Sequence, residues 1–224
     1  MTLTLPALEI CRRRHTLIHP HIETWSRKLT ARPELAAQPL VRDWVARGWP
    51  LIARRPSAHE AHGIPVGLPL PPSAGKARVA LMLNHDDIDR AEPLPTLAAA
   101  LETAPVTWRP ALHALVATAA AHQVSVYVFG SLAWQHLTGL PYLSPTSDVD
   151  LAWSAPSRDR LDALLHAIAE VERAAPMGVD GEIVLRDGAA ANWRELHDCR
   201  TDVMLKTSND VILATRASFE QDLT

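Results

Sequence analysis

Every second residue is a large aliphatic in two stretches of the first half of the chain, residues 64–68 and residues 79–83. A period of two is typical of strands that bury one face. The segment between them contains Pro71, Pro72 and Gly75, which favour a loop. Residues 63–83 are therefore predicted to form a β-hairpin. The chain before residue 60 is expected to mix turns and short helices with one short strand.

A helical period replaces this alternation in residues 96–122. The large apolar side chains between Trp108 and Ala119 fall on one face of a helix. Thr107 is the expected N-cap of that helix, and Pro110 is tolerated in a first turn.

The rest of the chain predicts strands that alternate with helices. Short apolar runs at residues 124–129, 149–153 and 179–185 have the length of strands. A helix is expected after Ser157, and a late hairpin over residues 203–213. This order predicts an α/β (α+β) fold in which a mixed sheet carries flanking helices.

A polar stretch at residues 84–95 separates the predicted hairpin from the predicted helices and strands that follow. We therefore expect two domains. Residues 1–90 would form a smaller N-terminal α+β domain, and residues 91–224 would form the domain with the mixed sheet.

The composition is that of an ordinary globular protein, with 47% hydrophobic and 21% charged residues. The formal net charge of -3 gives no reason to expect a nucleic-acid partner. No apolar run approaches the ~18 residues that a membrane span needs, and Glu9 with the arginines at 12–14 does not fit a signal peptide. Cys11 and Cys199 match no metal or redox spacing, so reduced thiols and a cytoplasmic location are expected.

Gly130 and Ser131 directly follow the predicted strand at residues 124–129 and open a predicted short helix. Glycine lets the backbone approach a ligand closely. The first amides of a helix have no partner within the helix and bind phosphate oxygens. The sequence therefore predicts a phosphate-binding turn at these two residues.

Asp148 and Asp150 flank Val149 at the start of the next predicted strand. Because side chains alternate between the faces of a strand, both carboxylates point the same way. Mg²⁺ prefers such oxygen ligands where phosphates supply the others, and paired metal ions stabilise the attacking and leaving oxygens of an in-line displacement. A Mg²⁺ site is therefore predicted here, although two aspartates do not distinguish Mg²⁺ from Mn²⁺.

A third carboxylate is expected from the predicted strand at residues 179–185. Asp180 and Glu182 share a face by parity, so spacing alone does not choose between them. Glu182 is preferred because Ile183 and Val184 place it inside the apolar run, whereas Asp180 could simply begin the strand.

Four basic residues are candidates for binding substrate phosphates: Lys76, Arg78, Arg194 and Lys206. Three of them also have a structural interpretation. Lys76 could be an exposed hairpin residue, and Lys206 could protect an edge strand. Arg194 could instead brace the third carboxylate, or it could form a structural ion pair.

The order Phe129-Gly130-Ser131, then Asp148-Val149-Asp150, then an acidic strand resembles the polymerase-β-type nucleotidyltransferase superfamily. The segment between Ser131 and Asp148 is longer than is usual there, which points to a narrower match. With its neighbours this segment looks like the phosphoribosyl-dephospho-CoA transferases of the malonate decarboxylase system. Similar segments are SLAWQHLTGLxYL, SDxDL, RGWPL, GLPLPPS, GK, DGE and WREL, where x marks a position outside the resemblance.

This resemblance implies a nucleotidyltransferase-like fold and triphosphoribosyl-dephospho-CoA as substrate. A serine of the apo acyl-carrier subunit of malonate decarboxylase would attack the phosphate nearest the ribose, and pyrophosphate would leave. Asp148, Asp150 and Glu182 would hold the metal, and Glu182 or else Asp180 would help to deprotonate the serine. Gly130 and Ser131 would hold the leaving phosphates, and the N-terminal domain would bind substrate or carrier.

Two other interpretations stay open at this point. A related nucleotidyltransferase could use another acceptor, such as the citrate lyase acyl carrier or a small molecule. A non-catalytic module could bind a nucleotide or a carrier protein, although it would gain nothing from paired carboxylates that repel each other. Mg²⁺-dependent release of pyrophosphate would separate the enzymes from the module, and direct assay of acceptors would separate the enzymes.

Overall fold

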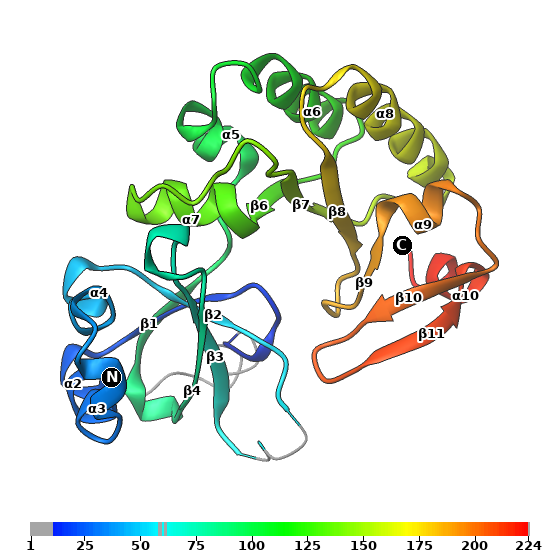
Figure 1. The fold of residues 1–224 in the computed structure, drawn as a ribbon. Helices are drawn as coiled ribbons and strands as arrows, with labels where there is room; N and C mark the ends of the chain where they lie inside the picture. Colours follow the sequence, from blue (N-terminus) through cyan, green and yellow to red (C-terminus); the bar gives the residue numbers. More distant parts are fainter. Residues whose placement is uncertain (1–10, 58–59, 61, 224) are drawn as a thin grey trace. The chain divides into compact units, whose positions relative to one another are not determined.

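The structure is a computed structural model that describes residues 11–57, 60 and 62–223. It divides into two compact units, Met1–Pro93 and Leu94–Thr224 (Figure 1). Each unit has its own β-sheet with helices. The predicted mixed α/β (α+β) fold class is therefore confirmed, and each unit is described by itself.

Within the described residues of the first unit, the strands form one antiparallel sheet in the order β4-β3-β2-β1-β5. The predicted hairpin is present, and its partners run in register from Ile64 opposite Leu83 to Pro69 opposite Arg78. The elements are β1 (Leu17–Pro20), α2 (Ile22–Thr30), α3 (Pro33–Ala36), α4 (Pro39–Arg42), β2 (Leu51–Ala53), β3 (Ile64–Pro69), β4 (Arg78–Leu83) and β5 (Ile88–Glu92).

Within residues 94–223, the second unit contains a sheet in the order β11-β10-β9-β8-β7-β6. The β7–β8 pair is parallel, and the other neighbouring pairs are antiparallel. Its elements are α5 (Leu97–Ala100), α6 (Arg109–Ala121), β6 (Val126–Phe129), α7 (Gly130–Thr138), β7 (Val149–Ser154), α8 (Leu161–Ala174), β8 (Val179–Val184), β9 (Ala190–Asn192), α9 (Trp193–His197), β10 (Asp202–Lys206), β11 (Val211–Thr215) and α10 (Arg216–Gln221).

The predicted helix at residues 96–122 is divided in two. Helix α5 is followed by a 3₁₀ turn, and α6 begins only at Arg109. Pro105 explains the break, because proline disfavours helical conformation in the residue before it and lacks the amide that a helix needs. The N-cap position belongs to Trp108 rather than to Thr107, and no side-chain hydrogen bond caps the helix there.

The two faces of the second sheet differ in chemistry. Val149, Leu151 and Trp153 of β7 are fully buried and pack in one cluster with side chains of α6 and α8. The residues between them point to the opposite face, because strand side chains alternate. Asp150 therefore lies on the face opposite this helix-packed core.

Candidate active site

Three aspartates meet at one end of the second sheet. One carboxylate oxygen from each of Asp148, Asp150 and Asp180 lies within 4.8 Å of the other two. Asp148 directly precedes β7, and Asp150 pairs with Asp180 across the parallel β7–β8 ladder. Asp148 is exposed and the other two are half-buried, so the cluster is accessible from solvent. We call these three residues the aspartate cluster.

Gly130 brings the start of α7 against this cluster. Its φ is +64°, and a Cβ added to it would lie 1.8 Å from Oδ2 of Asp150. Phe129, the residue before it, pairs with Asp150 in the β6–β7 ladder. Only glycine fits here, because the backbone is left-handed and an added Cβ would overlap the Asp150 carboxylate. Ser131 follows in the first turn of α7 and is half-buried.

The long segment between Ser131 and Asp148 is anchored by Gln135 of α7. Its Oε1 accepts hydrogen bonds from the amides of Tyr142 and Leu143, each at 3.1 Å. Tyr142 is 6% exposed and packs near the buried Trp134, and burial raises the pKa of the Tyr142 hydroxyl. The segment is thus held against its own helix where it returns toward Asp148.

Asp180 is held by neighbours on β8, β9 and α9. Its Oδ1 accepts hydrogen bonds from the amide of Gly181 at 2.8 Å, from Nδ2 of Asn192 at 3.0 Å and from Nη1 of Arg194 at 3.2 Å. Arg194 also donates a hydrogen bond to Glu172 of α8. Arg194 thus forms ion pairs with Asp180, one of the two candidates for the third carboxylate, and with Glu172. Its expected contact with substrate stays a prediction.

Glu182 is not part of the aspartate cluster, and its expected role as the third metal ligand stays a prediction. It pairs with Ala152 in the β7–β8 register, two residues beyond Asp180. It is 3% exposed, and its Oε1 lies 2.6 Å from Nζ of Lys206. Both acidic residues point to the same face of β8, so the sequence could not show which of them lies beside Asp150. The parallel register of β7 and β8 places Asp180 there.

The remaining predicted phosphate contacts lie in two different places. Lys206 is the last residue of β10 and joins Glu182 on the sheet that carries the cluster. Lys76 and Arg78 belong to the first unit, where both are exposed and Arg78 begins β4. Lys76 has a φ of +53° in the turn that precedes this strand. A substrate contact for Lys76 and Arg78 stays a prediction.

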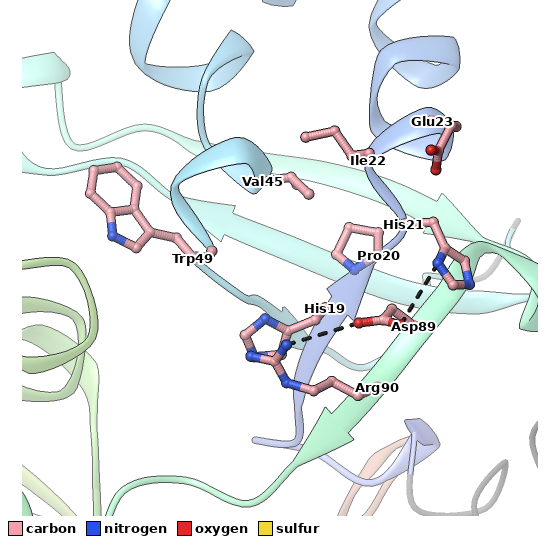
Figure 2. A pocket seen from close by; sticks show the side chains of 10 residues that line it. His19, Pro20, His21, Ile22, Glu23, Val45, Trp49, Asp89 and Arg90 are labelled. Carbon is pink, nitrogen blue, oxygen red and sulfur yellow. Dashed lines mark hydrogen bonds and ion pairs between the residues drawn. The ribbon is translucent and has the colours of Figure 1, made fainter.

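A pocket of about 310 Å³ in the first unit escaped the sequence analysis (Figure 2). It lies along β1 and β5, two strands that were not predicted. Acidic and basic side chains both line it: Asp89 lies 3.9 Å from Arg90 and 3.8 Å from His21, and Glu23 also lines it. Because charges of both signs surround it, its chemistry selects no particular ligand.

The mixed sheet with three carboxylates beside the first turn of a helix fits a transferase of the nucleotidyltransferase kind. Residues 13–93 match the N-terminal domain of phosphoribosyl-dephospho-CoA transferase MdcG, and residues 96–217 match its C-terminal domain. The chain belongs to this family and is an enzyme. The family name implies a phosphoribosyl-dephospho-CoA substrate and an acceptor for it.

Similar proteins named phosphoribosyl-dephospho-CoA transferase match most of the chain. The protein from Bradyrhizobium diazoefficiens is 42% identical over 206 residues, which are 92% of this chain and 91% of that protein. The one from Xanthomonas campestris pv. campestris is 37% identical, over 92% of this chain and 95% of its own. The one from Xanthomonas euvesicatoria pv. vesicatoria is 40% identical, over 81% and 86%. No solved structure matches the chain.

Among the helices that the structure describes, none combines the length and the apolar character needed to cross a membrane.

Proposed function

We propose that this protein transfers the prosthetic group of triphosphoribosyl-dephospho-CoA to a serine of the apo acyl-carrier subunit of malonate decarboxylase and releases pyrophosphate. The observation that carries the proposal is the aspartate cluster, set against the glycine that begins α7. The resemblance of the sequence to the malonate decarboxylase transferases supports the acceptor. Family membership supports the transferred group.

In the proposed reaction the serine hydroxyl oxygen attacks the phosphorus nearest the ribose. A new phosphorus–oxygen bond forms, and the bond from that phosphorus to the oxygen bridging to the next phosphate breaks. Pyrophosphate leaves with that oxygen, and a phosphodiester joins the prosthetic group to the carrier. The hydroxyl proton passes to a carboxylate oxygen of Asp180, which Asn192 and Arg194 hold in place.

Asp148, Asp150 and Asp180 fit a divalent cation, because three carboxylates this close repel one another unless a positive charge lies between them. Mg²⁺ is the proposed ion, with Mn²⁺ as a substitute. When bound, such an ion offsets the negative charge of the reacting phosphates. In this proposed set Asp180 is the third metal ligand, in place of Glu182, which the sequence analysis preferred.

The phosphate chain has candidate partners among the residues of the second unit. The amides at the start of α7 and the Ser131 hydroxyl are proposed to bind its oxygens, since a helix N-terminus favours anions. Lys206 adds a positive point charge. Lys76 and Arg78 of the first unit are proposed as further contacts, within a domain that binds substrate or carrier. The free thiols Cys11 and Cys199 fit the proposed cytoplasmic location.

The test is the intact mass of the purified apo carrier subunit after incubation with this protein, Mg²⁺ and triphosphoribosyl-dephospho-CoA. We expect the carrier to gain the mass of the prosthetic group and pyrophosphate to accumulate in equal amount. Asp148→Asn, Asp150→Asn and Asp180→Asn should each slow transfer by roughly 100-fold or more. Asp202→Asn, which changes an exposed aspartate on β10, is the matched control and should keep wild-type activity.

Different results would contradict the acceptor, the enzymatic activity and the role of the aspartate cluster. Transfer to the citrate lyase carrier but not to the malonate decarboxylase carrier would reassign the acceptor. Binding of the substrate without any transfer would favour the non-catalytic module. Near-normal transfer by the Asp148 and Asp150 variants would remove the cluster from the mechanism.

A further inference from the structure

The ion pair between Glu182 and Lys206 lies on the same sheet face as the aspartate cluster. Glu182 follows Asp180 by two residues on β8, so the two side chains share a face about 7 Å apart along the strand. Lys206 reaches this face from β10, two strands away in the sheet. Its Nζ lies 2.6 Å from Oε1 of Glu182.

The pair is asymmetric in its exposure. The Glu182 side chain is 4% exposed, whereas that of Lys206 is 34% exposed. The carboxylate is therefore enclosed, and the ammonium group borders on solvent. A lysine side chain has many rotamers, and a fixed carboxylate restricts where its charge can lie.

Stability is a weak reason for such a pair. Removing two charges from water costs free energy that their attraction only partly offsets, and apolar residues of similar volume often do as well. The position of the pair is more informative. A cation lies beside Glu182, two residues along β8 from Asp180, on the face that carries the carboxylates proposed to hold the metal.

We propose that Glu182 is a positioning residue that holds the ammonium group of Lys206 where it binds the departing pyrophosphate. This inference rests on the proposed function and gives Glu182 a different role from the metal ligand expected from sequence. Glu182 acts through Lys206, and Lys206 contacts the phosphate. The ion pair thus joins the leaving-group site to the sheet that carries the aspartate cluster.

The test is a double-mutant cycle read out as affinity for magnesium pyrophosphate, measured by calorimetry on the full chain. Glu182→Gln and Lys206→Met should each weaken binding by roughly tenfold, the value of one hydrogen bond to a charged group. The double variant should bind no more weakly than Lys206→Met alone, because Glu182 acts only through Lys206. Lys206→Arg keeps the charge within reach of Glu182 and should restore most of the affinity.

A second measurement separates this role from metal binding. Affinity for Mn²⁺, followed by electron paramagnetic resonance, should be unchanged in Glu182→Gln and reduced in Asp180→Asn. Circular dichroism confirms that each variant is folded. Unchanged pyrophosphate affinity in Glu182→Gln, additive effects in the double variant, or loss of Mn²⁺ affinity in Glu182→Gln would each overturn the proposal.

The two proposals fail in different ways. If the carrier subunit gains no mass with the wild-type protein, the proposed acceptor is wrong, and the pyrophosphate cycle can still be measured. If the carrier gains mass but Glu182→Gln binds pyrophosphate as well as the wild type does, only the positioning role is lost.

Discussion

Gly130 shows how one residue can set the geometry of the aspartate cluster. It begins α7 with a φ of +64° and leaves no room for a Cβ beside Asp150. The start of the helix and the carboxylate can approach only because this side chain is missing. The sequence indicated a glycine before a helix, but it could not show that the group in contact with the glycine would be Asp150.

Gly130→Ala should abolish transfer while leaving most of the fold intact. The added Cβ would overlap the Asp150 carboxylate, so the carboxylate or the helix start must shift. We expect activity to fall by roughly 100-fold or more, since small displacements of catalytic groups cost that much. Gly139→Ala is the matched control: its φ is +71°, and no atom lies within 4 Å of the added Cβ.

Both variants should lose about 1 kcal/mol of unfolding free energy from backbone strain. The Gly139 variant should nevertheless keep its activity within a factor of about two, because nothing there touches the cluster. Urea denaturation and the carrier mass assay measure the two quantities separately. Equal activity of the Gly130 and Gly139 variants would show that close approach to Asp150 is not needed.

The acidic residues show which part of a site the sequence can predict. The shared face of Asp148 and Asp150 follows from the alternation of a strand. Which of Asp180 and Glu182 lies beside Asp150 does not, because both have the same parity. It follows from the parallel pairing of β7 with β8, which sets Asp180 opposite Asp150.

At the scale of elements, Asp87 joins the turn before β5 to helix α2. It is 4% exposed, and it accepts hydrogen bonds from the amide of Asn84 at 2.8 Å and from Nη2 of Arg27 at 2.9 Å. Lys28 lies 3.4 Å away. Burial alone would raise the pKa of Asp87, but the Asn84 amide and the charges of Lys28 and Arg27 outweigh burial and hold it below its usual value.

Asp87→Asn should therefore destabilise the protein by about 2–3 kcal/mol at neutral pH, because the buried site keeps its cationic partners and loses the charge. The lowered pKa of Asp87 in the folded state means that this stabilisation is present above about pH 4 and is lost as pH falls through the folded pKa. Urea denaturation at pH 7 and pH 3 should show the difference between wild type and variant shrinking with acid.

Asp86→Asn is the control for this experiment, because Asp86 is the exposed neighbour in the same turn. It should change stability by less than about 0.5 kcal/mol at either pH. A similar loss in both variants would mean that the charge of the turn, rather than the buried contacts of Asp87, is what matters.

The elements that sequence analysis missed are short or lack a clear period. Strand β1 is buried at all four positions and so shows no alternation. Strand β5 is mostly polar, and β9 has three residues. Such strands are defined by their neighbours in the sheet, because their own side chains carry little periodic signal. By contrast, β3, β4, β7 and β8 have six residues each and were predicted, β3 and β4 from their alternation and β7 and β8 from their apolar runs.

At the scale of the whole molecule, the chain consists of two units, each with its own sheet and buried residues. The aspartate cluster belongs entirely to the second unit. Metal binding should therefore stabilise local structure there, because a ligand that binds only the folded state adds to its stability.

Hydrogen exchange followed by mass spectrometry can test this localisation. At 100 times its dissociation constant, Mn²⁺ should add about 2.7 kcal/mol of protection. We expect slower exchange in β7, β8 and the start of α7, and no change in β1 to β5. Asp148→Asn should remove the effect. Protection that appears mainly in the first unit would place the metal elsewhere.

The pairing of Asp150 with Asp180 also limits how this enzyme can change during evolution. The segment between Ser131 and Asp148 and the connection that contains α8 can gain or lose residues without moving either aspartate within its strand. A single insertion inside β8 before Asp180 would instead turn that side chain to the other face of the sheet. Insertions and deletions should therefore be tolerated on either side of the paired strands and excluded within them.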